Sequence, residues 1–384
     1  RKMKDKFANI IISFITLAMI AVIIVFGIII FNEVQEIQVS GNPEIDFNPK
    51  EQVGNFSNNN ATINNSEENE TVNNEIAKNP INEVSTPSTS NNTNTSLNRY
   101  YYKQLEDESK TIYNALINNK ENMKNGTYRI NLGNDFDTLL NTSTGEDQLG
   151  KYYQSAIEAF NYDNPDIFYL DCNKLYLNIE TTTRGEQKSF NIYINSGEQP
   201  NYFLDEYTSE EQVREAIQQV EQIKNQLVSR KTGNTYEDIK MVHDYLIDTI
   251  EYDKSLSKSN IYNIYGALIN KTAVCEGYAR AFKYILDGMN IETQIIIGKG
   301  QNSEGNIENH AWNYVSLNNT WYAVDCTWDD PIIIGGELSE EDKHKYFLEG
   351  ANEFLKDHIE STQFTDGGKV FKYPILNGDR YNQT

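Results

Sequence analysis

The chain begins with an uninterrupted apolar segment. Residues 7–31 read FANIIISFITLAMIAVIIVFGIIIF without a charge, and the basic tail RKMKDK precedes them. As a helix, this segment would extend roughly 37 Å, enough to cross a hydrocarbon core of about 30 Å. A cleaved signal peptide has a shorter apolar region and a small-residue cleavage site. We therefore expect residues 1–31 to form a cytoplasmic tail and a single transmembrane anchor, with everything after them outside the cell.

A polar stretch follows the apolar one. Residues 32–98 contain NFSNNNATINNSEENETVNNE and STPSTSNNTNTSLN, with few aliphatic side chains. Such a segment buries too little apolar surface to offset the entropy lost on ordering it. We expect a disordered Asn/Ser/Thr-rich linker.

Periodic patterning resumes near residue 99. Apolar residues at helical spacing in YYKQLEDESKTIYNALI predict a helix, and the alternating segments KLYLNIETTT and QKSFNIYINS predict a β-hairpin closed by Arg184-Gly185-Glu186. Helices are expected over Ser209–Ser229 and Thr235–Tyr252. We expect residues 99–232 to form a small α/β region and residues 233–384 to form the C-terminal domain.

The C-terminal pattern combines a buried helix with β-strands. AVCEGYARAFKYILDGMN predicts a helix that starts at or just after Cys275 and stops near Gly288. A β-rich run, IETQIIIG, and the segment Lys299–Asn309 follow, and we expect this segment to be a loop that gates access. The next strands, NHAWNYVSL and TWYAVDC, flank Asn318-Asn319, whose residues tolerate the positive φ of a tight turn.

That turn fixes which residues face each other. Leu317 would oppose Thr320, so His310 would oppose Thr327, and Asp325 would lie two residues away on the same face. A diagonal pair at this spacing is close enough for imidazole and carboxylate to meet.

Cys275, His310 and Asp325 together suggest nucleophilic chemistry. Backbone N–H groups at a helix N-terminus favour a thiolate and can stabilise an oxyanion. A thiol, an imidazole and a carboxylate form a nucleophile, base and orienting group. The alternative is a buried cysteine beside a structural His–Asp pair.

Composition narrows the function further. The 384 residues include 33 basic and 56 acidic side chains, for a formal net charge of −23. Nucleic-acid binding is not expected, because a phosphate backbone would be repelled. Three cysteines and four histidines, without CxxC or HExxH, do not predict a disulfide framework or a metal site.

The motifs AVCEGYARAF, NHAW and WYAVDCTWDDP resemble the transglutaminase-like superfamily, in its bacterial branch similar to kyphoscoliosis-type peptidases. The upstream segments MVHDYLIDTIEYD and IYGALINK resemble the same branch. The resemblance implies an α+β, papain-like core, with a cysteine-bearing helix packed on an antiparallel sheet. It also implies that Cys275 is the nucleophile, His310 the general base and Asp325 the orienting group.

The same resemblance leaves the oxyanion partner open. Trp312, Tyr265 and Trp328 are candidates, although each is also a natural core residue. We expect His243 to be structural, and His344 and His358 to be solvated or capping. Cys326 is expected in the core, where it could pair with Cys172.

The expected activity is thiol acyl chemistry on protein or peptide amides, such as cell-wall peptides, without a cofactor. It could proceed as proteolysis, deamidation or transamidation. The alternatives are a catalytically inactive binding or scaffold module of the cell envelope, and an envelope sensor or assembly protein.

Overall fold

A computed structural model describes residues 99–302, 305–330, 339–365 and 368–383. The predicted membrane anchor and linker lie outside this range. Within the described part of the chain, no helix is both long and apolar enough to span a bilayer. All described residues belong to one of the two compact units into which the chain divides, Phe47–Thr384.

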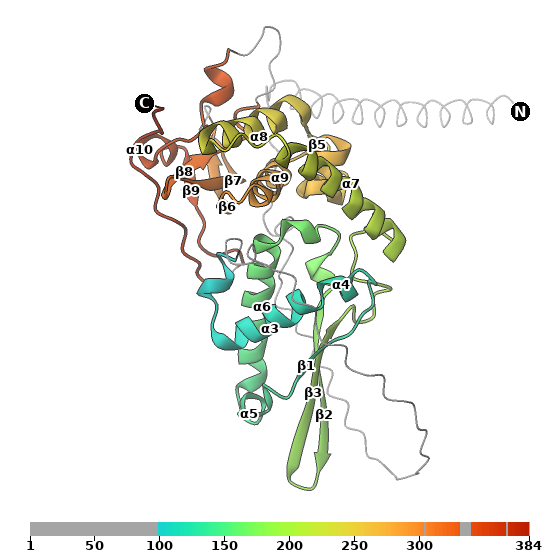
Figure 1. Cartoon of the computed structure of the whole chain (residues 1–384). Helices are drawn as coiled ribbons and strands as arrows, with labels where there is room; N and C mark the ends of the chain where they lie inside the picture. Colours follow the sequence, from blue (N-terminus) through green and yellow to red (C-terminus); the bar gives the residue numbers. More distant parts are fainter. Residues whose placement is uncertain (1–98, 303–304, 331–338, 366–367, 384) are drawn as a thin grey trace, which may run out of the picture. The chain divides into compact units, whose positions relative to one another are not determined.

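The first part of the described chain consists of helices and a small antiparallel sheet (Figure 1). The predicted hairpin is confirmed, because Arg184 pairs with Gln187 across a two-residue turn in which Gly185 has a φ of 62°. The remaining strand of this sheet, Ile130–Gly133, pairs with the second strand of the hairpin. The elements of this region are α3 (Asp107–Asn118), α4 (Lys120–Met123), β1 (Ile130–Gly133), α5 (Asp137–Leu140), α6 (Gly145–Asp163), β2 (Tyr176–Arg184) and β3 (Gln187–Asn195).

The first predicted helix begins later than its apolar pattern indicated. Residues Tyr102–Gln104 form a short 3₁₀ turn, and the α-helix starts only at Asp107. Tyr101 lies before both and is fully buried, with its backbone N–H donating to Asp163 Oδ1 at 3.0 Å. Tyr101 fits the helical spacing of apolar residues, but it is a buried core residue that precedes the helix.

Two long helices follow, close to their predicted positions. α7 (Glu210–Val228) starts after Ser209, whose side chain accepts from the N–H of Gln212. α8 (Thr235–Thr249) is capped in the same way by Asn234. It ends earlier than predicted because the next residues form β4 (Glu251–Tyr252).

The cysteine-bearing helix packs on a four-stranded antiparallel sheet (Figure 1). The strand order is β8-β7-β6-β9. The turn at Asn318-Asn319 is confirmed, with φ values of 55° and 60° and with Leu317 opposite Thr320. The elements are β5 (Thr272–Ala273), α9 (Cys275–Gly288), β6 (Thr293–Gln301), β7 (Ile307–Leu317), β8 (Thr320–Val324), α10 (Ala351–Phe354) and β9 (His358–Glu360).

The expectation of a gating loop over Lys299–Asn309 was wrong. β6 runs to Gln301 and β7 starts at Ile307, so most of this segment is a paired ladder in which Lys299 lies opposite Asn309. Gly300 is therefore a strand residue, because the predicted β-rich run continues past Gly298 to Gln301. A Cβ at Gly298 would lie 2.1 Å from Ile359 O, so glycine permits the close approach of β9.

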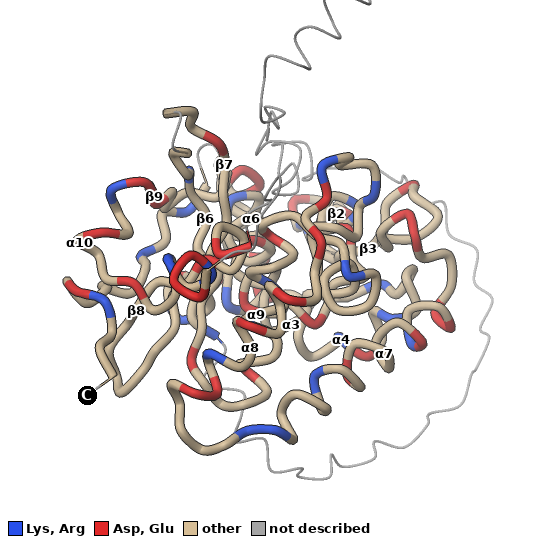
Figure 2. Tube along the Cα trace, turned by 90° about the horizontal axis from the view of Figure 1, so that it is seen from above, with Lys and Arg blue, Asp and Glu red and all other residues tan. Residues whose placement is uncertain are grey.

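Hydrogen bonds join the first region to the part that carries Cys275. Arg280 of α9 donates through Nη1 to Asn161 O at 2.9 Å, and Asn263 donates to Phe168 O at 3.3 Å. The hydroxyl of Tyr101 donates to Ile295 O on β6. Acidic and basic residues are interspersed over several of these elements (Figure 2).

Candidate active site

Cys275 is the first residue of α9 and is 2% exposed. The parallel pairing of β4 with β5 positions it, since β5 ends two residues before the cysteine. Val274 is the N-cap residue of α9. Its backbone is extended, and its side chain makes no capping hydrogen bond. The first backbone N–H groups of α9 therefore lie beside the thiol without a capping side chain, as an oxyanion site requires.

His310 lies on β7, directly opposite Gly298. Its Nε2 is 2.6 Å from Oδ2 of Asp325, which follows the end of β8. Cys275 is one of the groups that raise the pKa of His310, so its thiol lies near the ring. Because Nε2 faces the carboxylate, Nδ1 is the nitrogen left for the sulfur. The structure thus pairs His310 with Asp325 and places Cys275 near the same imidazole.

The electrostatics of these three residues favour a charged imidazole. Burial lowers the pKa of His310, but the charge and hydrogen bond of Asp325 and the contact with Cys275 outweigh burial and raise that pKa to about 9. Burial acts to raise the pKa of Asp325, yet the two imidazoles beside it hold that pKa well below its usual range. An imidazolium–carboxylate pair is the favoured state at neutral pH.

Asp325 is held from several directions. Its Oδ1 accepts the backbone N–H groups of Thr327 and Trp328 at 3.0 and 3.2 Å. Its Oδ2 accepts from His310 and also lies 3.1 Å from Nε2 of His358. The carboxylate therefore has little rotational freedom and can orient the His310 ring.

The expectation that His358 is solvated or capping was wrong. It is 1% exposed and is bonded to Asp325, and its ring stacks on Phe354 with centroids 3.8 Å apart. Sequence patterning missed it because β9 has only three residues, too few to show a period.

Two of the three oxyanion candidates pack around the imidazoles. Trp328 stacks on His310 with a centroid separation of 5.0 Å, and the fully buried Trp312 lies against His358 at 4.9 Å. A Cβ at Gly300 would lie 2.5 Å from Trp328 Cζ2, so glycine at this position makes room for the indole. These contacts place both tryptophans as walls of the site.

The third candidate, Tyr265, lies elsewhere. Its hydroxyl donates to Gln219 of α7 at 3.0 Å, and its ring stacks on Phe168. None of its described contacts involves the thiol, the His310 ring or the Asp325 carboxylate.

A different tyrosine lies near the thiol. Tyr252 of β4 pairs with Ala273, two residues before Cys275. Burial and then the negative charge of Cys275 raise the pKa of Tyr252. Tyr252 belongs to the quoted segment MVHDYLIDTIEYD, but its spacing from Cys275 gave no sign that the two residues meet.

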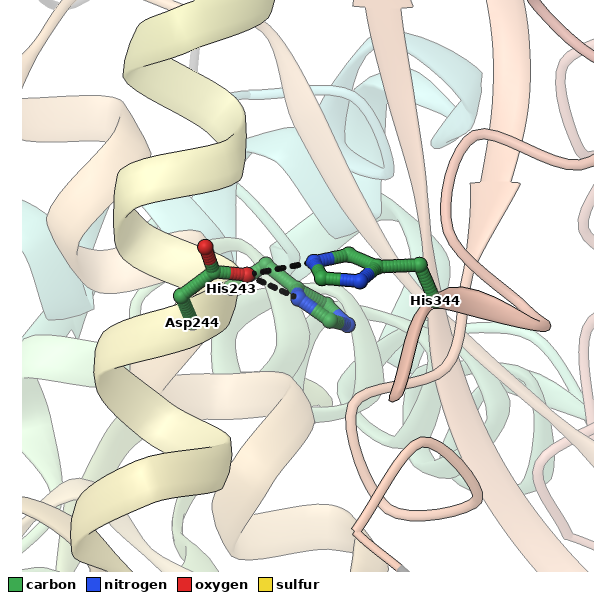
Figure 3. A group of neighbouring side chains, drawn as sticks. All are labelled: His243, Asp244 and His344. Atoms are coloured by element: carbon green, nitrogen blue, oxygen red, sulfur yellow. Dashed lines mark hydrogen bonds and ion pairs between the residues drawn. The ribbon is translucent and has the colours of Figure 1, made fainter. Parts of the chain in front are cut away.

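A second group of ionisable side chains lies between α8 and the segment that carries His344 (Figure 3). Oδ1 of Asp244 is 3.0 Å from His243 Nδ1 and 2.7 Å from His344 Nε2. Although these ligand-type atoms lie within 4.8 Å of one another, the Lys240 ammonium is already 3.0 Å from His344 Nε2 and 2.5 Å from Asp244 Oδ2. The group is therefore an ion-pair network.

His243 is the buried member of that network. Its Nε2 lies 3.0 Å from Oδ2 of the fully buried Asp329. Carboxylates thus flank both ring nitrogens, and their hydrogen bonds raise the pKa of His243 against the lowering effect of burial. The predicted structural role fits, because His243 connects α8 to the turn that follows Asp325.

All three cysteines are free thiols, so Cys172 and Cys326 do not form a disulfide in the structure. Burial raises the pKa of Cys172 to about 12 and that of Cys326 well above its usual range. Cys326 lies in the core, as predicted.

A cysteine at a helix N-terminus facing a histidine on an antiparallel sheet defines the papain-like α+β class. Residues 221–326 match the family model of the transglutaminase-like superfamily, so this part of the chain is a transglutaminase-like domain. The matched range includes Cys275, His310 and Asp325 and ends before His358. A comparison with curated proteins finds no match.

Similar solved structures include a TGase, at 13% identity and a TM-score of 0.28, covering 45% of this chain and 50% of that one. Another is the periplasmic domain of TgpA from Pseudomonas aeruginosa, at 14% identity and a TM-score of 0.23, covering 37% of this chain and 55% of that one. This chain thus spans about half the length of either structure.

Proposed function

We propose that this protein is a cysteine-dependent peptidase or acyltransferase that acts on protein or peptide amides. The observation that carries the proposal is the buried His310–Asp325 pair, 2.6 Å apart, beside a cysteine at the first position of α9. Each of these groups has the chemical character that its role demands: a thiol, a titratable base and a fixed carboxylate.

The reaction would begin from the state in which His310 already holds the proton of the Cys275 thiol, a thiolate beside an imidazolium. The thiolate then attacks the amide carbonyl carbon, and the carbonyl oxygen takes up the electron pair as an oxyanion. Backbone N–H groups at the start of α9 would donate to that oxyanion. Collapse of the intermediate expels the amine, which takes its proton from His310. Water or a second amine then opens the thioester, giving hydrolysis or transamidation.

We further propose that residues 7–31 anchor the chain in the cell membrane with the catalytic region outside. The support is the length of this uncharged run and the basic residues before it. Substrates would then be proteins or peptides of the cell envelope, such as cell-wall peptides.

Near-complete burial of the site favours one competing function. Cys275 is 2% and His310 is 6% exposed, as would suit a non-catalytic binding or scaffold module that retains the three residues as packing. The enzyme hypothesis requires substrate to reach the sulfur, so the two hypotheses differ in whether Cys275 reacts.

The test is thioester trapping on the full chain in detergent. The protein is incubated with envelope extract, quenched in acid, and the adducts are located by peptide mass spectrometry. We expect an acyl adduct on Cys275 that is lost in Cys275→Ala and strongly reduced in His310→Ala. Cys172 and Cys326 serve as internal controls and should stay unmodified. A folded wild-type protein with no Cys275 adduct would favour the binding module.

A further inference from the structure

The carboxylate of Asp325 is shared by two histidines. Its Oδ2 is 2.6 Å from His310 Nε2 and 3.1 Å from His358 Nε2. The two imidazoles come from strands on either side of β6, where His310 faces Gly298 and His358 faces Gly300. Because those two positions have no side chains, the rings come within 5.6 Å of each other, measured between centroids.

The second nitrogen of His358 also faces a carboxylate. Its Nδ1 is 2.8 Å from Oδ1 of Asp357, whose other oxygen accepts from the hydroxyl of Tyr346 at 2.9 Å. An ionised carboxylate only accepts hydrogen bonds, and a neutral imidazole has only one N–H. Both bonds can form together only if both nitrogens of His358 carry protons, which makes the ring a cation.

We propose that His358 is a positioning residue of the active site, a buried imidazolium that fixes Asp325 and shares its negative charge with His310. This inference rests on the proposed function and extends it, because His358 lies outside the residues matched by the family model. The three-residue site becomes a site of five groups: Asp357, His358, Asp325, His310 and Cys275.

The packing around His358 keeps its charge inside the protein. Phe354 stacks on one face of the ring, with 18° between the planes, and Trp328 and Trp312 lie within 5 Å. In this apolar surrounding the interaction between charges is stronger than in water.

The charged groups near His358 are few among the described residues. Asp325 and Asp357 bond it directly, His310 lies across Asp325, and the ammonium of Lys345 donates to the Tyr346 hydroxyl at 2.9 Å. The hydrogen bonds of the two carboxylates raise the pKa of His358 against the lowering effect of burial. The balance therefore favours the cation.

A positive charge on His358 affects both members of the reacting pair, Cys275 and His310. It stabilises a thiolate at Cys275 and opposes a proton on His310, so both groups lose their protons at lower pH. Loss of that charge should move both ionisations to higher pH, by about 1 pH unit at this separation. A neutral His358 that only packed the site would give no such movement when replaced by a neutral side chain.

The test measures iodoacetamide alkylation of Cys275 against pH in the full chain in detergent, read by peptide mass spectrometry, and needs no substrate. For His358→Gln we expect both midpoints of the pH profile to rise by about 1 unit. Asp357→Asn lets an amide N–H donate to Nδ1, so His358 can lose its charge with its hydrogen bonds kept. In Asp357→Asn both midpoints should rise, but by less than in His358→Gln. The reason is that this variant removes the negative charge of Asp357 together with the positive charge of His358.

His344→Gln is the matched control, since that histidine bonds Asp244 away from the site, and its profile should stay at the wild-type position. If His358→Gln does not fold, Asp357→Asn decides the question. Unmoved midpoints, or midpoints that move down, overturn the inference alone. A wild-type Cys275 that reacts no faster than an ordinary exposed thiol at neutral pH overturns the proposed function and this inference with it.

Discussion

His310 Nε2 and Asp325 Oδ2 lie 2.6 Å apart, although one residue precedes and the other follows the tight turn between β7 and β8. The short contact exists because β7 and β8 are held in one register by the turn at Asn318-Asn319. The same carboxylate is fixed by two backbone N–H groups, so the His310 ring keeps one orientation.

Asp325→Asn should therefore abolish most of the reactivity. If Asn Oδ1 keeps the two backbone bonds, its NH₂ group faces the imidazole N–H groups, and His310 must change tautomer or turn away. We expect alkylation of Cys275 and thioester formation to fall about 10³- to 10⁴-fold. Asp330→Asn is the matched control, because Asp330 accepts from Tyr278 instead of from an imidazole. Less than a tenfold loss in Asp325→Asn would contradict the assigned role.

The parts of this site that local signals encode were predictable. Two Asn residues mark the turn, and strand alternation then places His310 and Asp325 on one face, as observed. The start of α9 at Cys275 followed from helical spacing.

The parts set by long-range packing were not predictable. His358 reaches Asp325 from a three-residue strand 33 positions further along the chain. Gly300 falls in the segment expected to be a loop, yet it lies in β6 with Gly298, and the missing side chains of these two glycines make room for β9 and Trp328. Tyr265 had the expected residue type, but α7 holds it elsewhere.

Tyr252 is the hydroxyl that we expect to assist the reaction. Burial and then the charge of Cys275 raise the pKa of Tyr252, so its phenol belongs to the groups around the sulfur. We expect this phenol to donate to the developing oxyanion. Tyr252→Phe should slow thioester formation by about tenfold or more. Tyr265→Phe should leave the rate unchanged, because its hydroxyl bonds Gln219. Equal rates for both variants and wild type would remove Tyr252 from the mechanism.

Gly300→Ala should damage the site through Trp328. The added methyl group would lie 2.5 Å from the indole and 3.4 Å from His310 Cδ2, so the stacked pair must separate. We expect a loss of about 1–3 kcal/mol in the free energy of unfolding, with a lower rate of Cys275 alkylation. In Gly378→Ala the nearest atom is the flexible amide of Asn352 at 3.3 Å, and we expect a change within about 0.5 kcal/mol. Chemical denaturation and alkylation rates compare the two, and similar losses in both variants would rule out the specific effect.

The protonation of His310 links the active site to folding stability. The folded-state pKa of His310 is about 9, against an ordinary value of 6.5, because Asp325 and Cys275 outweigh burial. The folded protein therefore holds this proton more tightly than the unfolded chain does. The resulting stabilisation is complete below pH 6.5 and is lost as the pH rises toward 9.

We expect wild type to lose about 3 kcal/mol more than His310→Gln between pH 6.5 and 9. The measurement is urea denaturation of both proteins across this range, and the difference between their curves isolates this one group. Asp325 contributes in a separate window, since its lowered pKa gives stability that is lost only as the pH falls below its ordinary value of 3.8. A constant difference between wild type and His310→Gln from pH 6.5 to 9 would show that the imidazole holds no extra proton in the folded protein. His310 would then be neutral when the reaction begins, and the thiol would ionise only as its proton is taken.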